Sequence, residues 1–339
     1  MTGPDAVATV YSTSHDTAAP REERPPPAFH APTASPRARP SWLRALGWRI
    51  EMLAWQCLAA LLSQLGHENA LRLGEQVGRL MPWVSPRRLR IAKRDLRRVF
   101  GETKAEAEID AIARRCLVTL SATLAELLWL RRATREEVGA LVEFDEGATA
   151  ALAQAAARGR GVILAGIHFG RWELMFLGIN MGGPQFTLVA RPLANPYLDA
   201  YVNQIRCRFG NSIAYITDTP SMDEALSSRR ALLIAVDHRS ERQGTVVDFL
   251  GQATRLKTGM ARLAHRHGAS LLPVYALPLP HGRLRITIGP MLESTPSGME
   301  ECDIEHLTQR AADVLGGVIR SHPQYWMWSH RRLWNSPSG

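Results

Sequence analysis

Short apolar runs alternate with segments of helical periodicity from about residue 142 to residue 321. The runs that predict strands are 162–168, 186–191, 213–217, 231–237, 270–277 and 284–289. Helical patterns fall before, between and after them, at 147–158, 171–181, 197–209, 221–227, 257–267 and 303–321. Such alternation is typical of an α/β fold. The sequence therefore predicts a mixed, largely parallel central sheet flanked by helices.

The chain before this core divides into two further regions. Residues 1–40 are rich in Pro, Ala, Ser and Thr and lack hydrophobic periodicity, so we expect a disordered tail. The tail also lacks the apolar segment of a signal peptide, so export is not expected. Residues 41–141 form a helical, membrane-associating region in this interpretation, residues 142–335 form the α/β core, and 41–335 fold as one unit.

Residues 41–82 combine tryptophans, arginines and a dense apolar run. The longest uncharged part, Met52–Leu65, is 14 residues. A helix needs roughly 20 apolar residues to cross a bilayer. We therefore favour a helix that lies in the membrane interface. A core helix and a single tilted span are the alternatives.

The chain is basic, with a net charge of +9 and a pI near 9.9. The densest basic run, 87–98, keeps a helical apolar stripe, and helices are also expected at 105–131 and 134–140. The basic side chains would face anionic headgroups or a phosphorylated substrate, although such a face is often merely solvated. No nucleic-acid motif accompanies the run. The four cysteines are scattered, which argues against a disulfide framework or a zinc site and fits a reducing compartment.

The stretch 162–173 carries the strongest candidate for catalysis. An apolar run ends at His168, and helical periodicity begins at Arg171, which places Glu173 about one turn into the helix. Ligands and catalytic groups of α/β folds gather at the carboxyl ends of the strands. His168 is therefore expected at the edge of the sheet where chemistry is usually performed.

The spacing of His168 and Glu173 suggests a catalytic pair. On one helix, residues five positions apart point about 140° from each other. If His168 lies in the turn before the helix, Glu173 can reach back and fix the imidazole tautomer. The other ring nitrogen can then take a proton from a hydroxyl. A lone His-x4-Glu pattern is weak, and a strand-end histidine with an ordinary hydrogen bond is the alternative.

Other polar residues also follow predicted strands. Arg191 could bind a phosphate or a carboxylate, or form a salt bridge to Glu173 or Asp199. Metal binding is conceivable for Asp237 with His238, but the sequence shows no third ligand. The segment Leu256–Gly259 opens a helix that could bind an anion at its N-terminus. Walker, dinucleotide-binding and G-x-S-x-G motifs are absent.

The last motif, residues 323–332, interleaves aromatic and basic side chains. It could pack under the active site or touch lipid. Its position at the end of the chain does not decide between these two interpretations.

These motifs together resemble the bacterial lipid A biosynthesis acyltransferases, the late lauroyl/myristoyl transferases of the lysophospholipid acyltransferase superfamily, over roughly residues 45–335. The residues that carry the resemblance are His168-Phe-Gly-Arg-Trp-Glu173, Arg191-Pro192 with Asn195-Pro196, Asp237 ahead of Asp248-Phe-Leu-Gly251, and Pro323–Arg332. The basic run 87–98 is similar to the family's N-terminal Arg-rich helix. Their order and spacing match the family.

The resemblance implies an O-acyltransferase that moves a fatty acyl chain from acyl carrier protein or coenzyme A to a hydroxyl of a lipid A precursor or related glycolipid. It places the enzyme at the cytoplasmic face of the bacterial inner membrane. His168 would be the general base and Glu173 its orienting partner. Arg171 and Arg191 would bind substrate or steady the oxyanion, and Asp237 would shape the site. No metal or cofactor is expected, and nucleic acid is not an expected partner.

The sequence also departs from the family pattern. His238 follows Asp237 where the family often has Gln, the Phe-Phe-Gly element is Phe249-Leu-Gly251, and Ala253-Thr254 replaces Pro-Ala. These departures concern the acceptor more than the chemistry. Other glycolipids, including phosphatidylinositol mannosides, and lysophospholipids are therefore alternative acceptors. A non-catalytic lipid-binding or membrane-tethering protein on the same fold is the alternative from another class.

No Ser or Cys is placed as an obvious covalent nucleophile. We therefore expect transfer in one step, in which His168 deprotonates the acceptor hydroxyl as it attacks the thioester. The basic character of the chain suits both an acidic carrier protein and a phosphorylated lipid.

Overall fold

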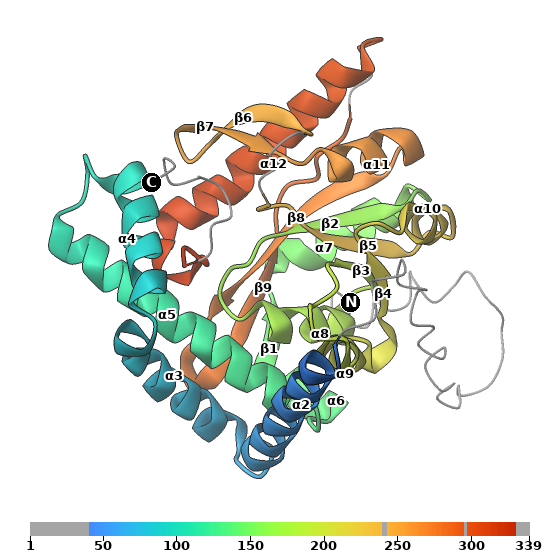
Figure 1. Ribbon diagram of the computed structural model, residues 1–339. Helices are drawn as coiled ribbons and strands as arrows, with labels where there is room; N and C mark the ends of the chain where they lie inside the picture. Colours follow the sequence, from blue (N-terminus) through green and yellow to red (C-terminus); the bar gives the residue numbers. More distant parts are fainter. Residues whose placement is uncertain (1–40, 239–242, 295–296, 330–339) are drawn as a thin grey trace, which may run out of the picture.

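A seven-stranded sheet forms the centre of the computed structural model, which describes residues 41–238, 243–294 and 297–329 (Figure 1). The predicted tail and residues 330–332 lie outside these ranges. The sheet order is β1-β9-β8-β2-β5-β3-β4. Its strands are β1 (Val142–Phe144), β2 (Val162–Gly166), β3 (Phe186–Ala190), β4 (Ser212–Tyr215), β5 (Ala231–Ala235), β8 (Ser270–Pro278) and β9 (Leu284–Ile288).

The predicted fold class is confirmed, because β2 pairs in parallel with β5 and β8, β3 with β4 and β5, and β1 with β9. The β8–β9 pair is antiparallel. All six predicted strands are present. The prediction missed β1, which has three residues, and the separate hairpin of β6 (Thr245–Phe249) and β7 (Gln252–Leu256). Charged residues interrupt the apolar pattern of that hairpin.

Helices cover both faces of the sheet. Leu164 of β2 belongs to the apolar cluster beneath α7 (Glu146–Ala157), α8 (Trp172–Gly182) and α9 (Pro196–Arg206). Its neighbours Ile163 and Ala165 belong to the cluster beneath α10 (Thr219–Ser227), α11 (Gly259–His267) and α12 (Glu300–Ser321). Successive side chains of a strand point to opposite faces. A strand buried on both faces is therefore apolar throughout, as the sequence predicted.

The N-terminal region is helical, as predicted, and its helices are α2 (Trp42–Leu62), α3 (His67–Val84), α4 (Pro86–Phe100), α5 (Glu106–Trp129) and α6 (Arg135–Leu141). Helix α3 lies against α5 at very short range. A Cβ added at Gly78 would come within 2.5 Å of the Val118 Cα, and one at Gly74 within 2.7 Å of the Ala125 Cβ. Only glycine permits this approach at the two positions.

Helix α2 buries one side and exposes an apolar stripe on the other. Met52, Ala59 and Leu62 are buried. The exposed stripe follows helical spacing and consists of Leu43, Leu46, Ile50, Leu53 and Leu61. Among the described residues, none of the helices combines the length and the apolar character that a membrane span requires.

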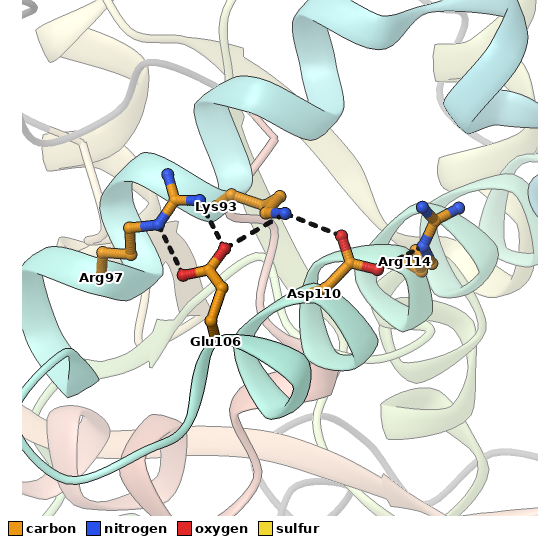
Figure 2. A network of polar contacts seen from close by, with 5 residues as sticks. All are labelled: Lys93, Arg97, Glu106, Asp110 and Arg114. Atoms are coloured by element: carbon orange, nitrogen blue, oxygen red, sulfur yellow. Dashed lines mark hydrogen bonds and ion pairs between the residues drawn. The ribbon is translucent and has the colours of Figure 1, made fainter.

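Helix α4, which carries the predicted basic run, uses several of its charges against α5 (Figure 2). Lys93 lies 3.2 Å from Glu106 and 2.9 Å from Asp110, and Arg97 forms two hydrogen bonds to Glu106. The Arg97 hydrogen bond is the main cause that lowers the pKa of Glu106 to about 2. These charges therefore hold α4 on α5 and are only partly available to a ligand.

Candidate active site

The strand register brings His168 and Asp237 together. Strands β2 and β5 are parallel neighbours, with Gly166 beside Ala235. The residues two positions beyond this pair, His168 and Asp237, therefore leave the sheet at the same level. The predicted location of His168 at the carboxyl edge of the sheet agrees with the structure.

A buried carboxylate orients the His168 ring. His168 Nδ1 lies 2.8 Å from Asp237 Oδ1. Asp237 Oδ2 accepts two further hydrogen bonds, from the His168 backbone N–H at 3.1 Å and from Trp326 Nε1 at 3.0 Å. Asp237 is fully buried, whereas the His168 side chain keeps 20% of its exposure. A carboxylate on Nδ1 leaves Nε2 to act as the base toward a substrate.

The C-terminal segment around η3 (Pro323–Tyr325) holds the turn that carries His168. The Gly170 N–H donates to the Tyr325 carbonyl at 2.8 Å, and the Met327 N–H donates to the His168 carbonyl at 3.1 Å. Gly170 has a φ of +59°, and a Cβ there would lie 3.0 Å from the Ala276 carbonyl oxygen. The described part of the final motif, residues 323–329, packs under the site, which agrees with the first of the two interpretations of this motif. The hydrogen bond from Trp326 to Asp237 was not predicted.

Glu173 does not hold His168, which corrects the predicted pairing. It lies in the first turn of α8 and is buried. Its carboxylate accepts two hydrogen bonds from Arg206, at 3.0 and 2.5 Å, and one from Trp172 Nε1 at 3.0 Å. Burial alone would lower the pKa of Arg206, but the Glu173 charge raises it overall. Glu173 thus fixes α8 against α9, and Asp237 occupies the orienting position.

Arg171 is also held by contacts within the protein. It is buried, and its guanidinium lies 2.6 Å from Glu126 of α5. The same group donates to the carbonyls of Gly282 and Arg283 at 2.8 and 2.7 Å. These partners occupy both terminal nitrogens. In the structure Arg171 joins the His168 turn to the N-terminal helices, and its role in substrate binding remains a prediction.

Arg191 is exposed at the end of β3 and lines a cavity of about 620 Å³. His238 lines the same cavity, and its ring centroid lies 5.2 Å from that of His168. The cavity is lined by apolar side chains of helices α10 and α11 and by several basic side chains. It is therefore suited to an amphipathic ligand next to the His168–Asp237 pair.

The metal alternative gains a third residue in the structure. Ligand atoms of His168, Asp237 and His238 lie within 4.8 Å of one another. Three N–H groups already donate to the Asp237 oxygens. Orientation of His168 is therefore a sufficient reason for a buried carboxylate at this position. The expectation of a metal-free reaction remains a prediction.

Comparison with known proteins agrees with the resemblance inferred from the motifs. Residues 43–335 match the family described as bacterial lipid A biosynthesis acyltransferase. The chain is 28% identical over 290 residues to a phosphatidylinositol mannoside acyltransferase of Mycolicibacterium smegmatis, which covers 83% of this chain and 87% of that protein. A protein of the same name from Mycobacterium tuberculosis is 30% identical over 177 residues, 51% of this chain and 54% of that protein.

The chain belongs to the bacterial lipid A biosynthesis acyltransferase family, because the match spans nearly its whole length. It is therefore an O-acyltransferase, and its family implies an acyl donor and a lipid acceptor.

We expect neutral amides in place of Asp237 and Glu173 to have different effects, the first on kcat and the second on stability. In Asp237→Asn, two N–H donors hold the amide oxygen, so the amide nitrogen faces His168 Nδ1. That contact forces the proton onto Nε2 and removes the base. We expect kcat to fall on the order of 10²- to 10⁴-fold, with little change in the free energy of unfolding. Acyl transfer assays and urea unfolding measure the two effects.

Glu173→Gln is the matched comparison. It leaves Arg206 without its charged partner, so we expect the free energy of unfolding to fall by about 3 kcal/mol. The fraction that remains folded should keep the pH dependence of the wild type. An unchanged stability in Glu173→Gln, or an active Asp237→Asn enzyme, would contradict these assignments.

Trp326→Phe tests the hydrogen bond to Asp237 while keeping an aromatic ring in place. Without the indole N–H the carboxylate becomes more basic and stabilises protonated His168. The acid limb of the kcat/KM profile should therefore move to higher pH, on the order of half a unit. Trp328→Phe is the control, because its indole N–H donates to the Pro323 carbonyl at 2.7 Å. Equal profiles for both variants would remove the role of Trp326.

Proposed function

We propose that this enzyme transfers a fatty acyl chain from a thioester donor to a sugar hydroxyl of a membrane glycolipid. The observation that carries the proposal is the 2.8 Å contact of His168 Nδ1 with the buried Asp237 carboxylate. It fixes the tautomer in which Nε2 can accept a proton. The adjacent cavity offers both apolar and basic walls for the substrates.

The reaction proceeds in one step in this proposal. His168 Nε2 takes the proton of the acceptor hydroxyl while its oxygen attacks the thioester carbonyl carbon. The carbon–sulfur bond breaks, and the leaving thiolate receives that proton from His168. Burial raises the pKa of Cys116 and of Cys207 to about 11, so these thiols remain protonated and are poor nucleophiles. Direct transfer therefore fits the chain better than an acyl-cysteine intermediate.

The acceptor we favour is a phosphorylated glycolipid of the phosphatidylinositol mannoside type. The names of the two mycobacterial relatives support it, because both are phosphatidylinositol mannoside acyltransferases. A lipid A precursor shares the sugar hydroxyls and the negative charge and is the second acceptor. The donor is acyl-CoA or acyl carrier protein, since both present the acyl chain as a thioester.

We also propose that the enzyme works at the cytoplasmic face of the cytoplasmic membrane, with α2 in the lipid interface. The exposed stripe of α2 would enter the acyl boundary. Arg44 and Arg49 are exposed on the same helix and would face anionic headgroups. Helix α3 adds Leu80, Trp83 and Val84, which are also exposed.

Mass spectrometry of membrane lipids tests the transfer. We expect cells that make the wild-type protein to gain a lipid heavier by one acyl chain, and cells that make His168→Ala to lack it. His306→Ala, an exposed histidine on α12, is the matched control and should act as the wild type. The test uses two host strains, one that contains phosphatidylinositol mannosides and one that contains lipid A precursors. If no lipid class differs between wild type and His168→Ala in either strain, the transferase proposal fails.

Vesicle flotation tests the membrane proposal. Leu46→Glu combined with Leu53→Glu places two charges in the exposed stripe, so binding to vesicles of phosphatidylcholine and phosphatidylglycerol should fall at least about tenfold. Gln56→Glu adds one charge to an exposed position of the same helix outside the stripe and should have a small effect. Equal binding of wild type and double variant would exclude α2 as the docking element.

A further inference from the structure

The cavity beside the catalytic pair has several basic residues in its lining. It opens between the carboxyl ends of β3 and β5 and the helices α10 and α11. Four of its lining residues are cations: Arg191, Lys257, Arg262 and Arg266. Two of them have acidic partners within the chain, since Arg262 lies 2.8 Å from Glu301 and Arg266 lies 3.1 Å from Asp223.

Arg191 and Lys257 differ from these two residues. In the ranges that the structure describes, neither side chain forms an ion pair or a hydrogen bond. Burial, followed by the positive charge of Arg191, lowers the pKa of Lys257 below its ordinary value. The mutual repulsion of these two cations is unfavourable for the fold. A ligand with negative charge would remove this repulsion.

The start of α11 adds a second attractive element to the lining of the cavity. Thr258 is the N-cap, and its side chain makes no capping hydrogen bond to the N–H groups of the first turn. Its hydroxyl instead accepts from Arg262 Nε at 3.3 Å. Thr258 and Gly259 line the cavity, and a Cβ at Gly259 would meet no atom within 4 Å. The positive end of a helix with free N–H groups favours an anion, and phosphate is the usual one.

We propose that Arg191, Lys257 and the first turn of α11 bind the phosphate ester of a substrate, while the apolar walls formed by Ile216, Met222 and Leu263 take the adjoining uncharged part. The inference rests on the proposed function and names a chemical feature of the substrate. Both substrates carry such a group: the donor in its phosphopantetheine or coenzyme A portion, and a phosphatidylinositol-based acceptor in its headgroup. His238 links this subsite to His168.

Isothermal titration with two soluble probes tests the site without turnover. Coenzyme A represents the donor, and dihexanoyl phosphatidylinositol below its micelle concentration represents the acceptor. Arg191→Gln and Lys257→Gln should each weaken the same probe by about 10- to 100-fold, the value of one hydrogen bond between charged groups. If the variants bind coenzyme A more weakly, the site belongs to the donor. If they bind dihexanoyl phosphatidylinositol more weakly, the site belongs to the acceptor.

Arg255→Gln is the matched control. It removes the same charge two residues from Lys257, on an exposed side chain that donates to the Gly244 carbonyl instead of lining the cavity. Its affinity for both probes should stay within about twofold of the wild type. In the absence of probe, Arg191→Gln and Lys257→Gln should unfold at the same or a higher temperature, because a repulsion is lost.

The proposal is overturned if both cavity variants bind both probes as tightly as the wild type, or if Arg255→Gln weakens binding equally. Failure of the proposed function gives a different result. A wild-type protein that binds a probe through Arg191 and Lys257 but transfers no acyl chain contradicts the transferase activity and supports the phosphate site.

Discussion

The hydrogen bonds to the buried Asp237 carboxylate are the interaction on which the site depends. A buried ionised carboxylate is costly unless donors satisfy it. Here the donors are the His168 ring, the His168 backbone and the Trp326 indole, so two distant parts of the sequence meet at Asp237. The same bonds that stabilise the charge also set the tautomer of the base. Stability and chemistry therefore impose the same geometry on this edge of the sheet.

Glu173, the carboxylate in the first turn of α8, supports the site without contacting His168. Glu173 and Arg206 join α8 to α9, and Arg171 joins the His168 turn to Glu126 on α5. Each pair anchors an element that flanks His168 without touching a reacting atom. A His-x4-Glu spacing can therefore locate a site correctly even though its glutamate stabilises the surrounding helices and does not contact the histidine.

The sheet was predictable because the strands buried on both faces are continuous apolar runs, and their ends place His168, Arg191 and Asp237 at one edge. The partner of His168 was not predictable from spacing alone, because Glu173 is near in sequence and Asp237 is 69 residues away. Strand order decides between them, and a single sequence does not reveal that β5 lies next to β2. The contribution of Trp326 was hidden for a similar reason, since the C-terminal segment returns to the site only in the folded chain. The β6–β7 hairpin was missed because its charged residues weaken the apolar alternation.

The N-terminal helices are tied to the substrate edge of the core by specific polar contacts. Asn195 caps α9 by accepting from Tyr197 N–H, and its amide donates to the Trp48 carbonyl and to Glu51 of α2 at 3.0 and 2.9 Å. One side chain thus holds the exposed apolar helix and also ends the loop that follows Arg191. A shift of α2 relative to the core would break both bonds at the start of α9. The surface that suits a lipid interface and the loop beside the catalytic pair are therefore held in one fixed arrangement.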